Sequence, residues 1–387
     1  MVRQQQKEMN MKLNRHNTVW KGYMTGKRLL AAFLGASLLL SGCGPAGGSQ
    51  GAFDASSEEN GKLKVAVTLF PYYDFVRQIA GDQVDLQMVI PAGMDSHSFE
   101  PTPADIRTIQ HADVLISNGG TMEHWLEDTL GALDTSNMTI VTMMDYVDTV
   151  EEEIVEGMED VGHDHDHAHS HAAADDHDHS HETPEEHAAH AQETDDHDHS
   201  DYVDHDGHEE AIEYDEHIWT SPVNAMKLVD VIGETLAEAD PAHAEVFRQG
   251  AADYKKELEE IDAGFREVSR NRKRNMIVMG DKFPFRYLAD EYQLDYRAAF
   301  SGCSSDTEPS AKTIAYLIDK VKEEQIPVVY YLELSSHRVS EIIGEETGAE
   351  PLLLHSCHNV TRAQFDAGIT YAGLMRQNIE NLRKGID

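Results

Sequence analysis

The sequence Lys62-Leu-Lys-Val-Ala-Val-Thr-Leu-Phe70 is rich in β-forming residues, alternates in polarity at its start and is followed by Pro71. This pattern predicts a β-strand that stops at the proline. We expect a helix over residues 72–80 and a second strand over residues 84–90. A strand, a helix and a strand in close succession are typical of a parallel sheet.

The same alternation continues toward the C-terminus. Helices are expected over residues 103–110 and 122–130, and strands over residues 112–117 and 138–146. The loop that follows the second strand contains His97. Ligands of parallel sheets bind at loops beyond the carboxyl ends of strands, so this loop is a candidate binding site.

A long helix is expected in the middle of the chain, after a helix over residues 222–239. Apolar residues recur every three or four positions from Val246 to Val268 and predict a helix over residues 241–270. At 1.5 Å per residue it would be about 45 Å long, which is enough to connect two lobes.

A second α/β set begins at Asn275. Strands are expected over residues 275–281, 326–334 and 351–357. Helices are expected over residues 285–292, 309–325, 337–347 and 362–384. The predicted fold class is therefore α/β, with two parallel-sheet lobes joined by a long rigid helix. The expected domains are an N-terminal lobe (62–240) with an insertion at 151–214, a linker helix (241–273) and a C-terminal lobe (274–387).

The chain begins with a leader. Leu29 to Leu40 is an apolar run preceded by Lys27 and Arg28, too short to span a bilayer but suited to a signal peptide. Leu40-Ser41-Gly42-Cys43 resembles the bacterial lipoprotein box, in which the cysteine is lipidated. We therefore expect a signal peptide over residues 1–42, with Met24 as an alternative start, and a tether over residues 43–61. The protein would be extracytoplasmic and anchored to the cell membrane through Cys43.

The insertion is acidic and rich in histidine. From Glu151 to Glu216 there are 26 acids and no Lys or Arg, in a chain of net charge −40. Such a segment buries too little apolar surface to fold, so we expect disorder. Its imidazoles and carboxylates would bind zinc weakly, and a plain solvated linker is the alternative. The candidate auxiliary ligands are His163, His165, His167, His169, His177, His179, His181, His197 and His199.

Two cysteines remain beside Cys43. An even pair in an exported domain predicts a disulfide between Cys303 and Cys357. Two free thiols or two soft metal ligands are the alternatives. The acidic balance argues against nucleic acid as a partner, because nucleic acid is bound by basic patches.

Two stretches resemble the signatures of one family. They are Pro91-Ala-Gly-Met-Asp-Ser-His97-Ser-Phe-Glu-Pro-Thr-Pro-Ala-Asp105 and Asp215-Glu-His217-Ile-Trp-Thr-Ser-Pro-Val-Asn-Ala225. The family comprises the metal-binding lipoproteins and periplasmic proteins of zinc and manganese ABC importers. Phe283-Pro-Phe-Arg-Tyr287, Glu308-Pro-Ser310 and Tyr331-Leu-Glu-Leu-Ser335 resemble further blocks of it. The resemblance implies one metal in a cleft between two α/β lobes, and the histidine-rich insertion resembles the zinc-importing branch.

The resemblance also implies a set of ligands. It puts His97 at the first ligand position and His217 at the second. The third position, His in zinc members and often Glu in manganese members, falls on Gly280, which has no side chain. The fourth, usually Asp, falls on or near His358, with His355 as the next choice.

Carboxylates are further candidates for this site. Asp281 and Glu333 each end an expected strand of the C-terminal lobe, where they could supply an oxygen ligand or orient another group. A disulfide at Cys357 would hold the loop of His358 in place. Three imidazoles and one carboxylate suit Zn2+, whereas more carboxylates would favour Mn2+.

The implied function is that of a metal receptor. The chain would capture Zn2+ outside the cytoplasm as a lipid-anchored monomer and deliver it to an ABC permease with its ATPase subunit. It is not expected to be an enzyme, because it lacks a His-Glu-x-x-His motif. The alternatives are a manganese receptor of the same family and a zinc-buffering or adhesion lipoprotein.

Overall fold

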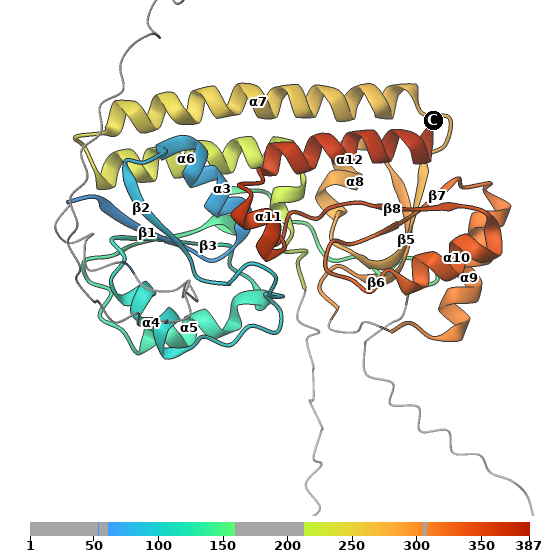
Figure 1. Cartoon of the computed structure of the whole chain (residues 1–387), viewed down its shortest axis with the longest axis horizontal. Helices are drawn as coiled ribbons and strands as arrows, with labels where there is room; N and C mark the ends of the chain where they lie inside the picture. Colours follow the sequence, from blue (N-terminus) through green and yellow to red (C-terminus); the bar gives the residue numbers. More distant parts are fainter. Residues whose placement is uncertain (1–52, 54–60, 159–212, 305–307) are drawn as a thin grey trace, which may run out of the picture. The chain divides into compact units, whose positions relative to one another are not determined.

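The computed structural model describes residue 53 and residues 61–158, 213–304 and 308–387 (Figure 1). The described residues all belong to one compact unit, residues 49–387. The predicted signal peptide and the tract from His163 to His208 lie outside the described residues. Within the described part, no helix combines the length and apolarity that a bilayer crossing needs.

The first sheet is parallel throughout, with strand order β2-β1-β3-β4. Its strands are β1 (Leu63–Val67), β2 (Val84–Met88), β3 (Val114–Ser117) and β4 (Thr139–Thr142). The intervening elements are α3 (Phe70–Ala80), α4 (Pro103–Gln110), η1 (Thr121–Glu123), α5 (His124–Gly131) and η2 (Met143–Tyr146). Valine and alanine at residues 65–67 of the central strand are fully buried, as expected for a sheet covered on both faces.

The second sheet repeats this design, with strand order β6-β5-β7-β8 and all pairs parallel. Its strands are β5 (Met276–Phe283), β6 (Asp295–Ser301), β7 (Val328–Tyr331) and β8 (Glu350–Leu353). The helices of this half are α8 (Arg286–Tyr292), α9 (Ala311–Glu323), α10 (Arg338–Thr347), α11 (Arg362–Asp366) and α12 (Tyr371–Ile386). The predicted class, two parallel-sheet lobes, is confirmed, while the domain boundaries stay predictions.

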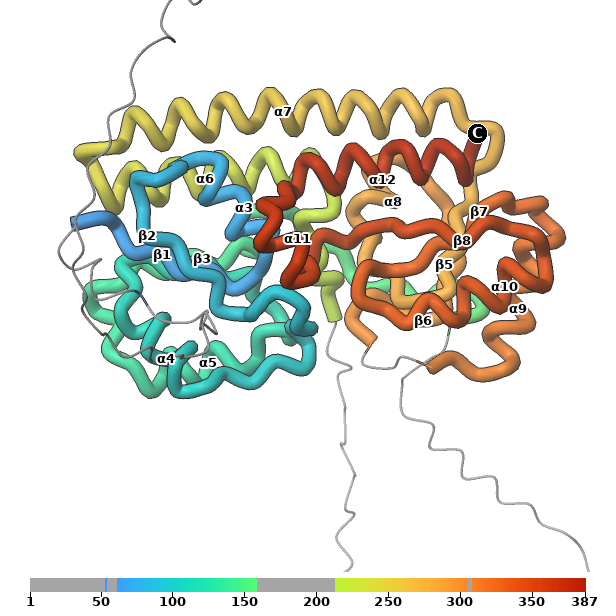
Figure 2. Tube along the Cα trace, viewed as in Figure 1, coloured from blue at the N-terminus to red at the C-terminus, as the bar shows by residue number. Residues whose placement is uncertain are grey.

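A layer of long helices runs along both sheets (Figure 2). After η3 (Ile218–Thr220), α6 (Pro222–Ala239) begins with a proline in its first turn, and the Ser221 hydroxyl accepts the Asn224 N–H at 3.3 Å. The next helix, α7 (Ala244–Asn271), packs on α6, α3 and α12. Gly250 makes the α3 contact possible, since a Cβ there would lie 2.1 Å from the Ile79 carbonyl oxygen.

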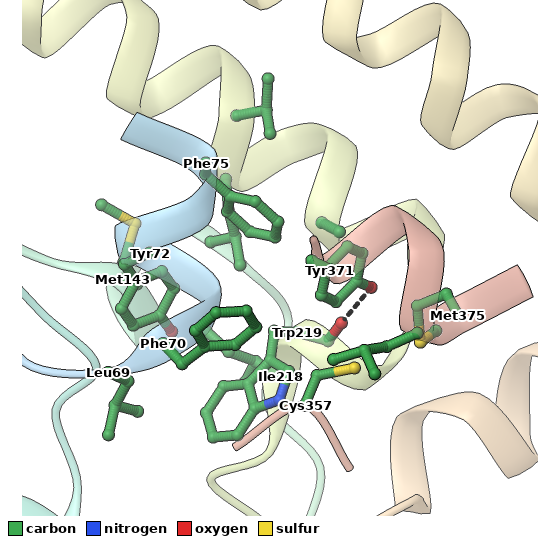
Figure 3. Close-up of a cluster of buried hydrophobic side chains, with 14 of the residues drawn as sticks. Leu69, Phe70, Tyr72, Phe75, Met143, Ile218, Trp219, Cys357, Tyr371 and Met375 are labelled. Atoms are coloured by element: carbon green, nitrogen blue, oxygen red, sulfur yellow. Dashed lines mark hydrogen bonds between the residues drawn. The ribbon is translucent and has the colours of Figure 1, made fainter. Parts of the chain in front are cut away.

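The two lobes share one hydrophobic core. Figure 3 shows Tyr72 of α3 and Trp219 of η3 beside Cys357 and Tyr371 from the C-terminal part of the chain. The Tyr371 hydroxyl donates to the Trp219 carbonyl at 2.7 Å, and the Trp219 indole N–H donates to the Ser356 carbonyl at 2.8 Å. The lobes are therefore joined by packing and buried hydrogen bonds as well as by chain connections.

A crossing segment, residues 150–158, leaves the first lobe and packs on the second. The Cys303 N–H donates to the Glu152 carboxylate at 2.8 Å, and Arg286 pairs with Glu153 at 2.9 Å. The chain then returns to form an antiparallel bridge between Glu151 and Tyr214. The chain on either side of residues 159–212 is thus held together against the second lobe.

The strand expected over residues 138–146 covers only Thr139–Thr142 and is followed by the short helix η2. Two further elements differ from the expectations. Strand β6 was not expected, because Asp295-Tyr-Arg-Ala-Ala-Phe-Ser301 has two alanines and no clear alternation, yet it pairs with β5 and is buried at its end. The single helix expected over residues 362–384 is split into α11 and α12. Gly368, with φ of 72°, follows α11, and the Thr370 hydroxyl then caps α12.

Candidate metal centre

Three imidazoles meet at the junction of the lobes. His97, His217 and His358 each offer a ring nitrogen, and these nitrogens lie within 4.8 Å of one another. Their ring centroids are 5.7 to 5.9 Å apart. They line a cavity of about 130 Å³. Three nitrogen donors at this spacing can surround one divalent ion.

The first imidazole is carried by the loop that follows β2. The His97 backbone N–H donates to the Asp95 carboxylate at 2.9 Å, which fixes the turn before the ring. From the other lobe, the Asn359 amide donates to the carbonyls of Pro91 and Met94 at 2.9 and 2.7 Å. The His97 loop is therefore positioned by the loop that carries His358.

The second imidazole is oriented by a buried carboxylate. Asp215 Oδ1 accepts the His217 backbone N–H at 2.8 Å and lies 3.2 Å from His217 Nδ1. A proton on Nδ1 leaves Nε2 as the free donor atom, and a carboxylate partner of this kind raises the basicity of a ligating histidine.

Glu216 anchors the same loop to the first lobe. Its carboxylate accepts the Thr121 hydroxyl and the Met122 N–H, both at 2.8 Å. Gly120, with φ of 83°, lies against it, and a Cβ there would approach the Glu216 Cδ to 2.4 Å. Only glycine fits this contact.

The third imidazole follows β8 in the second lobe. The Ser356 N–H and hydroxyl donate to the two Glu333 oxygens at 2.9 and 2.6 Å, and the Ser356 hydroxyl accepts the His358 N–H at 3.1 Å. His358 Nε2 contacts the Ser96 hydroxyl of the first lobe. His358 is thus held by both lobes.

Two of the three imidazoles are neutral near pH 7. Burial is the main cause that lowers the pKa of His97 to about 4, followed by the charge of His217. Burial, and then the charges of His217 and His97, lowers the pKa of His358 well below its usual value. Neutral imidazoles are the form that binds metals.

The expected carboxylates line the cavity but are not part of the imidazole cluster. Asp281 accepts the N–H groups of Lys282 and Leu332 at 3.0 and 3.4 Å. Glu333 accepts from Ser356. Their role as ligands stays a prediction.

Gly280 and His355 do not belong to the cluster of three imidazoles. A Cβ on Gly280 would lie 2.5 Å from the Ser340 hydroxyl of α10, so a side chain at this position would meet α10. Gly280 therefore supplies no ligand side chain, as expected from the sequence, and Ser340 occupies the space that such a side chain would need. His355 is 1% exposed, and its Nδ1 accepts the Cys357 N–H at 3.0 Å.

The predicted disulfide is wrong, since both cysteines are free thiols. Cys357 is fully buried beside Trp219 and Tyr371 (Figure 3). Cys303 instead follows β6, where its N–H bonds the crossing segment. The His358 loop is held by hydrogen bonds to Glu333 and Trp219 rather than by a covalent link. Cys43 and the tract histidines from His163 to His199 lie outside the described residues.

Three residues at or next to the site were not assigned a role from the sequence: Asp215 and Ser96, which contact its imidazoles, and Lys282, which lines the cavity. Asp215 lies two positions before His217, a spacing that could have indicated an orienting carboxylate. Ser96 is adjacent to His97 in the quoted motif. Lys282 had no signal of its own, because a lysine near a strand end is usually solvated.

Comparison with known proteins gives consistent matches. The family model described as zinc-uptake complex component A, periplasmic (ZnuA), matches residues 65–385. The zinc-binding protein AdcA of Streptococcus pyogenes serotype M3 is 33% identical over 327 residues, which are 84% of this chain and 56% of that protein. The high-affinity zinc uptake system protein ZnuA of Bacillus subtilis is 28% identical over 349 residues, covering 90% of this chain and 94% of that protein. This chain thus spans little more than half the length of the AdcA relatives.

Solved structures agree with the fold. The metal-dependent lipoprotein YcdH from Bacillus subtilis has a TM-score of 0.62 at 25% identity, covering 84% of this chain and all of that one. The Zn(II)-bound ZnuA-like domain of Streptococcus pneumoniae AdcA has a TM-score of 0.61 at 27% identity, with the same coverage.

Proposed function

Because the chain belongs to the family of periplasmic zinc-uptake complex A components, we propose that it is an extracytoplasmic receptor of an ABC importer. In this role it captures Zn2+ and delivers the ion to a membrane permease. Zinc is the cargo of the protein and leaves it at the end of each cycle.

The cluster of three imidazoles carries this proposal. His97 and His217 come from the first lobe and His358 from the second, and all three reach one cavity. Neutral nitrogen donors suit zinc, whereas manganese prefers sites rich in oxygen. An ion that bridges the lobes stabilises the arrangement in which they are closed, through mass action.

The proposed receptor works outside the cytoplasm with partners in the membrane. The receptor would act as a monomer with a permease and its ATPase subunit, and a lipid on Cys43 would anchor it to the membrane. A relative of 28% identity is named a zinc-binding lipoprotein, from Streptococcus pneumoniae, which supports the anchor.

Substitution of the imidazoles tests the metal site. We expect His97→Ala, His217→Ala and His358→Ala each to weaken tight zinc binding by at least about a hundredfold, because each substitution removes one of the three imidazole ligands. Competition with a strong zinc chelator measures the change. His111→Ala, at an exposed position after α4, is the matched control. Tight zinc binding that survives all three substitutions would contradict the proposal.

Deletion of residues 162–208 separates receptor from buffer. One tight zinc retained per chain supports the receptor, whereas loss of all zinc binding supports a zinc-buffering lipoprotein. Competition between zinc and manganese on the same deletion variant tests the manganese alternative. If the deletion variant binds manganese in preference to zinc at equal free concentrations of the two ions, manganese is the cargo.

A further inference from the structure

A lysine lines the cavity together with the three imidazoles. Lys282 lies near the end of β5 and is half-buried. Among the described residues, no carboxylate forms an ion pair with its ammonium group. After burial and the neighbouring imidazoles, its charge is a further cause that lowers the pKa of His358. Lys282 therefore brings a positive charge close to the place where another cation is expected to bind.

Three carboxylates line the cavity, and each accepts hydrogen bonds from the protein, Asp95 from the His97 N–H. Asp281 accepts two backbone N–H groups, and both oxygens of Glu333 accept from Ser356. None of the three belongs to the imidazole cluster. Zinc is almost always four-coordinate in sites of this kind, so three imidazoles leave one position to be filled by another donor.

Electrostatics decides which donor fits that position. Imidazole ligands neutralise none of the charge on Zn2+. The carboxylates of Asp95 and Asp215 near His97 attract the ion, whereas the ammonium of Lys282 repels it. A small anion between the ion and this ammonium would coordinate zinc and accept a charge-assisted hydrogen bond from the ammonium. The cavity of about 130 Å³ is large enough, because one water needs only about 10–15 Å³ on the same measure.

We propose that the cavity holds an anion subsite formed by Lys282, and that zinc is captured together with one small coordinating anion as its fourth ligand. The anion belongs to the class of halides and simple carboxylates. This inference rests on the proposed function, because it presupposes zinc on the three imidazoles. It gives Lys282 the role of a residue that selects which form of zinc is taken up.

Zinc affinity in different salts tests the subsite. The full chain is titrated against a chelator strong enough to leave weak sites empty, in potassium nitrate, chloride or acetate at constant ionic strength and pH. The chelator fixes free zinc in each salt. We expect the affinity to rise by about tenfold when chloride or acetate replaces weakly coordinating nitrate. Acetate and chloride arms distinguish a carboxylate from a halide.

Substitution of the lysine supplies the controls. Lys282→Met should abolish the gain, while Lys282→Arg, which keeps the charge, should retain it. Lys312→Met, at an exposed position of the same lobe, should behave as the wild type. The visible spectrum of the cobalt-loaded protein provides a second measurement, because an anion bound to the metal shifts the absorption bands.

Two results would overturn the subsite. One is equal zinc affinity in all three salts, and the other is a Lys282→Met protein that keeps the full gain. Loss of tight zinc binding in every salt would instead refute the proposed function, so the two failures are distinguishable.

Discussion

At the scale of single residues, the orientation of His217 depends on one buried carboxylate. We predict that Asp215→Asn weakens zinc binding by about 10- to 100-fold, because the amide is a weaker partner for the imidazole Nδ1–H than the carboxylate. Chelator competition measures the affinity, and thermal unfolding checks that the fold is kept. Asp128→Asn is the matched control, since Asp128 is exposed on α5 and does not line the cavity. Equal effects of the two substitutions would contradict this role of Asp215.

Glu123 gives the protein a pH dependence that is separate from the metal site. It is 3% exposed, and burial is the main cause that raises its pKa from 4.5 to about 7. The folded state therefore binds this proton more tightly than the unfolded state. The resulting stabilisation is fully present below pH 4.5 and is lost as the pH rises through 7.

We therefore predict that Glu123→Gln flattens the dependence of stability on pH. Between about pH 4.5 and about pH 8 the unfolding free energy of the wild type should fall by up to about 3 kcal/mol more than that of the variant. Urea unfolding of metal-free protein at several pH values measures this difference. Glu127→Gln, at an exposed position of α5, should follow the wild type. If the unfolding free energies of Glu123→Gln and the wild type change with pH in the same way, the Glu123 carboxyl is not a source of the pH dependence of stability.

The residues of the candidate site were predictable only where they stand in a recognisable local sequence motif. His97 and His217 stand in long motifs, so both were identified without a structure. His358 was reached by position alone, and Lys282 was missed because its meaning comes from the residues across the cavity. The prediction of a disulfide failed for a related reason. An even number of cysteines does not indicate where the fold places Cys357.

At the scale of elements, the contact between α3 and α7 depends on a glycine. We predict that Gly250→Ala lowers the unfolding free energy by about 1–3 kcal/mol, because its Cβ would press on the α3 backbone at Ile79. Gly131→Ala is the control, since a Cβ there meets nothing within 4 Å and alanine favours the helix. Denaturant unfolding of both variants gives the comparison. Destabilisation by Gly131→Ala of the same size would point to a general intolerance of glycine replacement.

Elements with strong periodicity were predictable, and those shaped by their neighbours were not. The apolar stripe of α7 is visible in the sequence, because one face of a long helix is buried along its whole length. Strand β6 contains alanines that are neutral between helix and strand, and pairing with β5 decides its state.

At the scale of the whole molecule, the lobes have little freedom to separate. They share the core around Trp219, the crossing segment spans them, and α7 packs along both. We predict that the zinc-free and zinc-bound forms have the same radius of gyration within error. Small-angle scattering on a variant that lacks residues 162–208 measures this, and hydrogen exchange should change mainly in the loops of His97 and His358. A wide hinge opening in the zinc-free form would be incompatible with the shared core.

The last helix also sets the order in which the protein can fold. The Asp74 carboxylate of α3 accepts the Tyr371 backbone N–H, and the Tyr371 ring packs on Phe75 at a centroid distance of 5.0 Å (Figure 3). The core of the first lobe is therefore completed by residues close to the C-terminus of the chain. A polypeptide whose synthesis or translocation has not reached α12 exposes these aromatic side chains and cannot close its first lobe. We therefore expect the chain to fold as one cooperative unit rather than lobe by lobe.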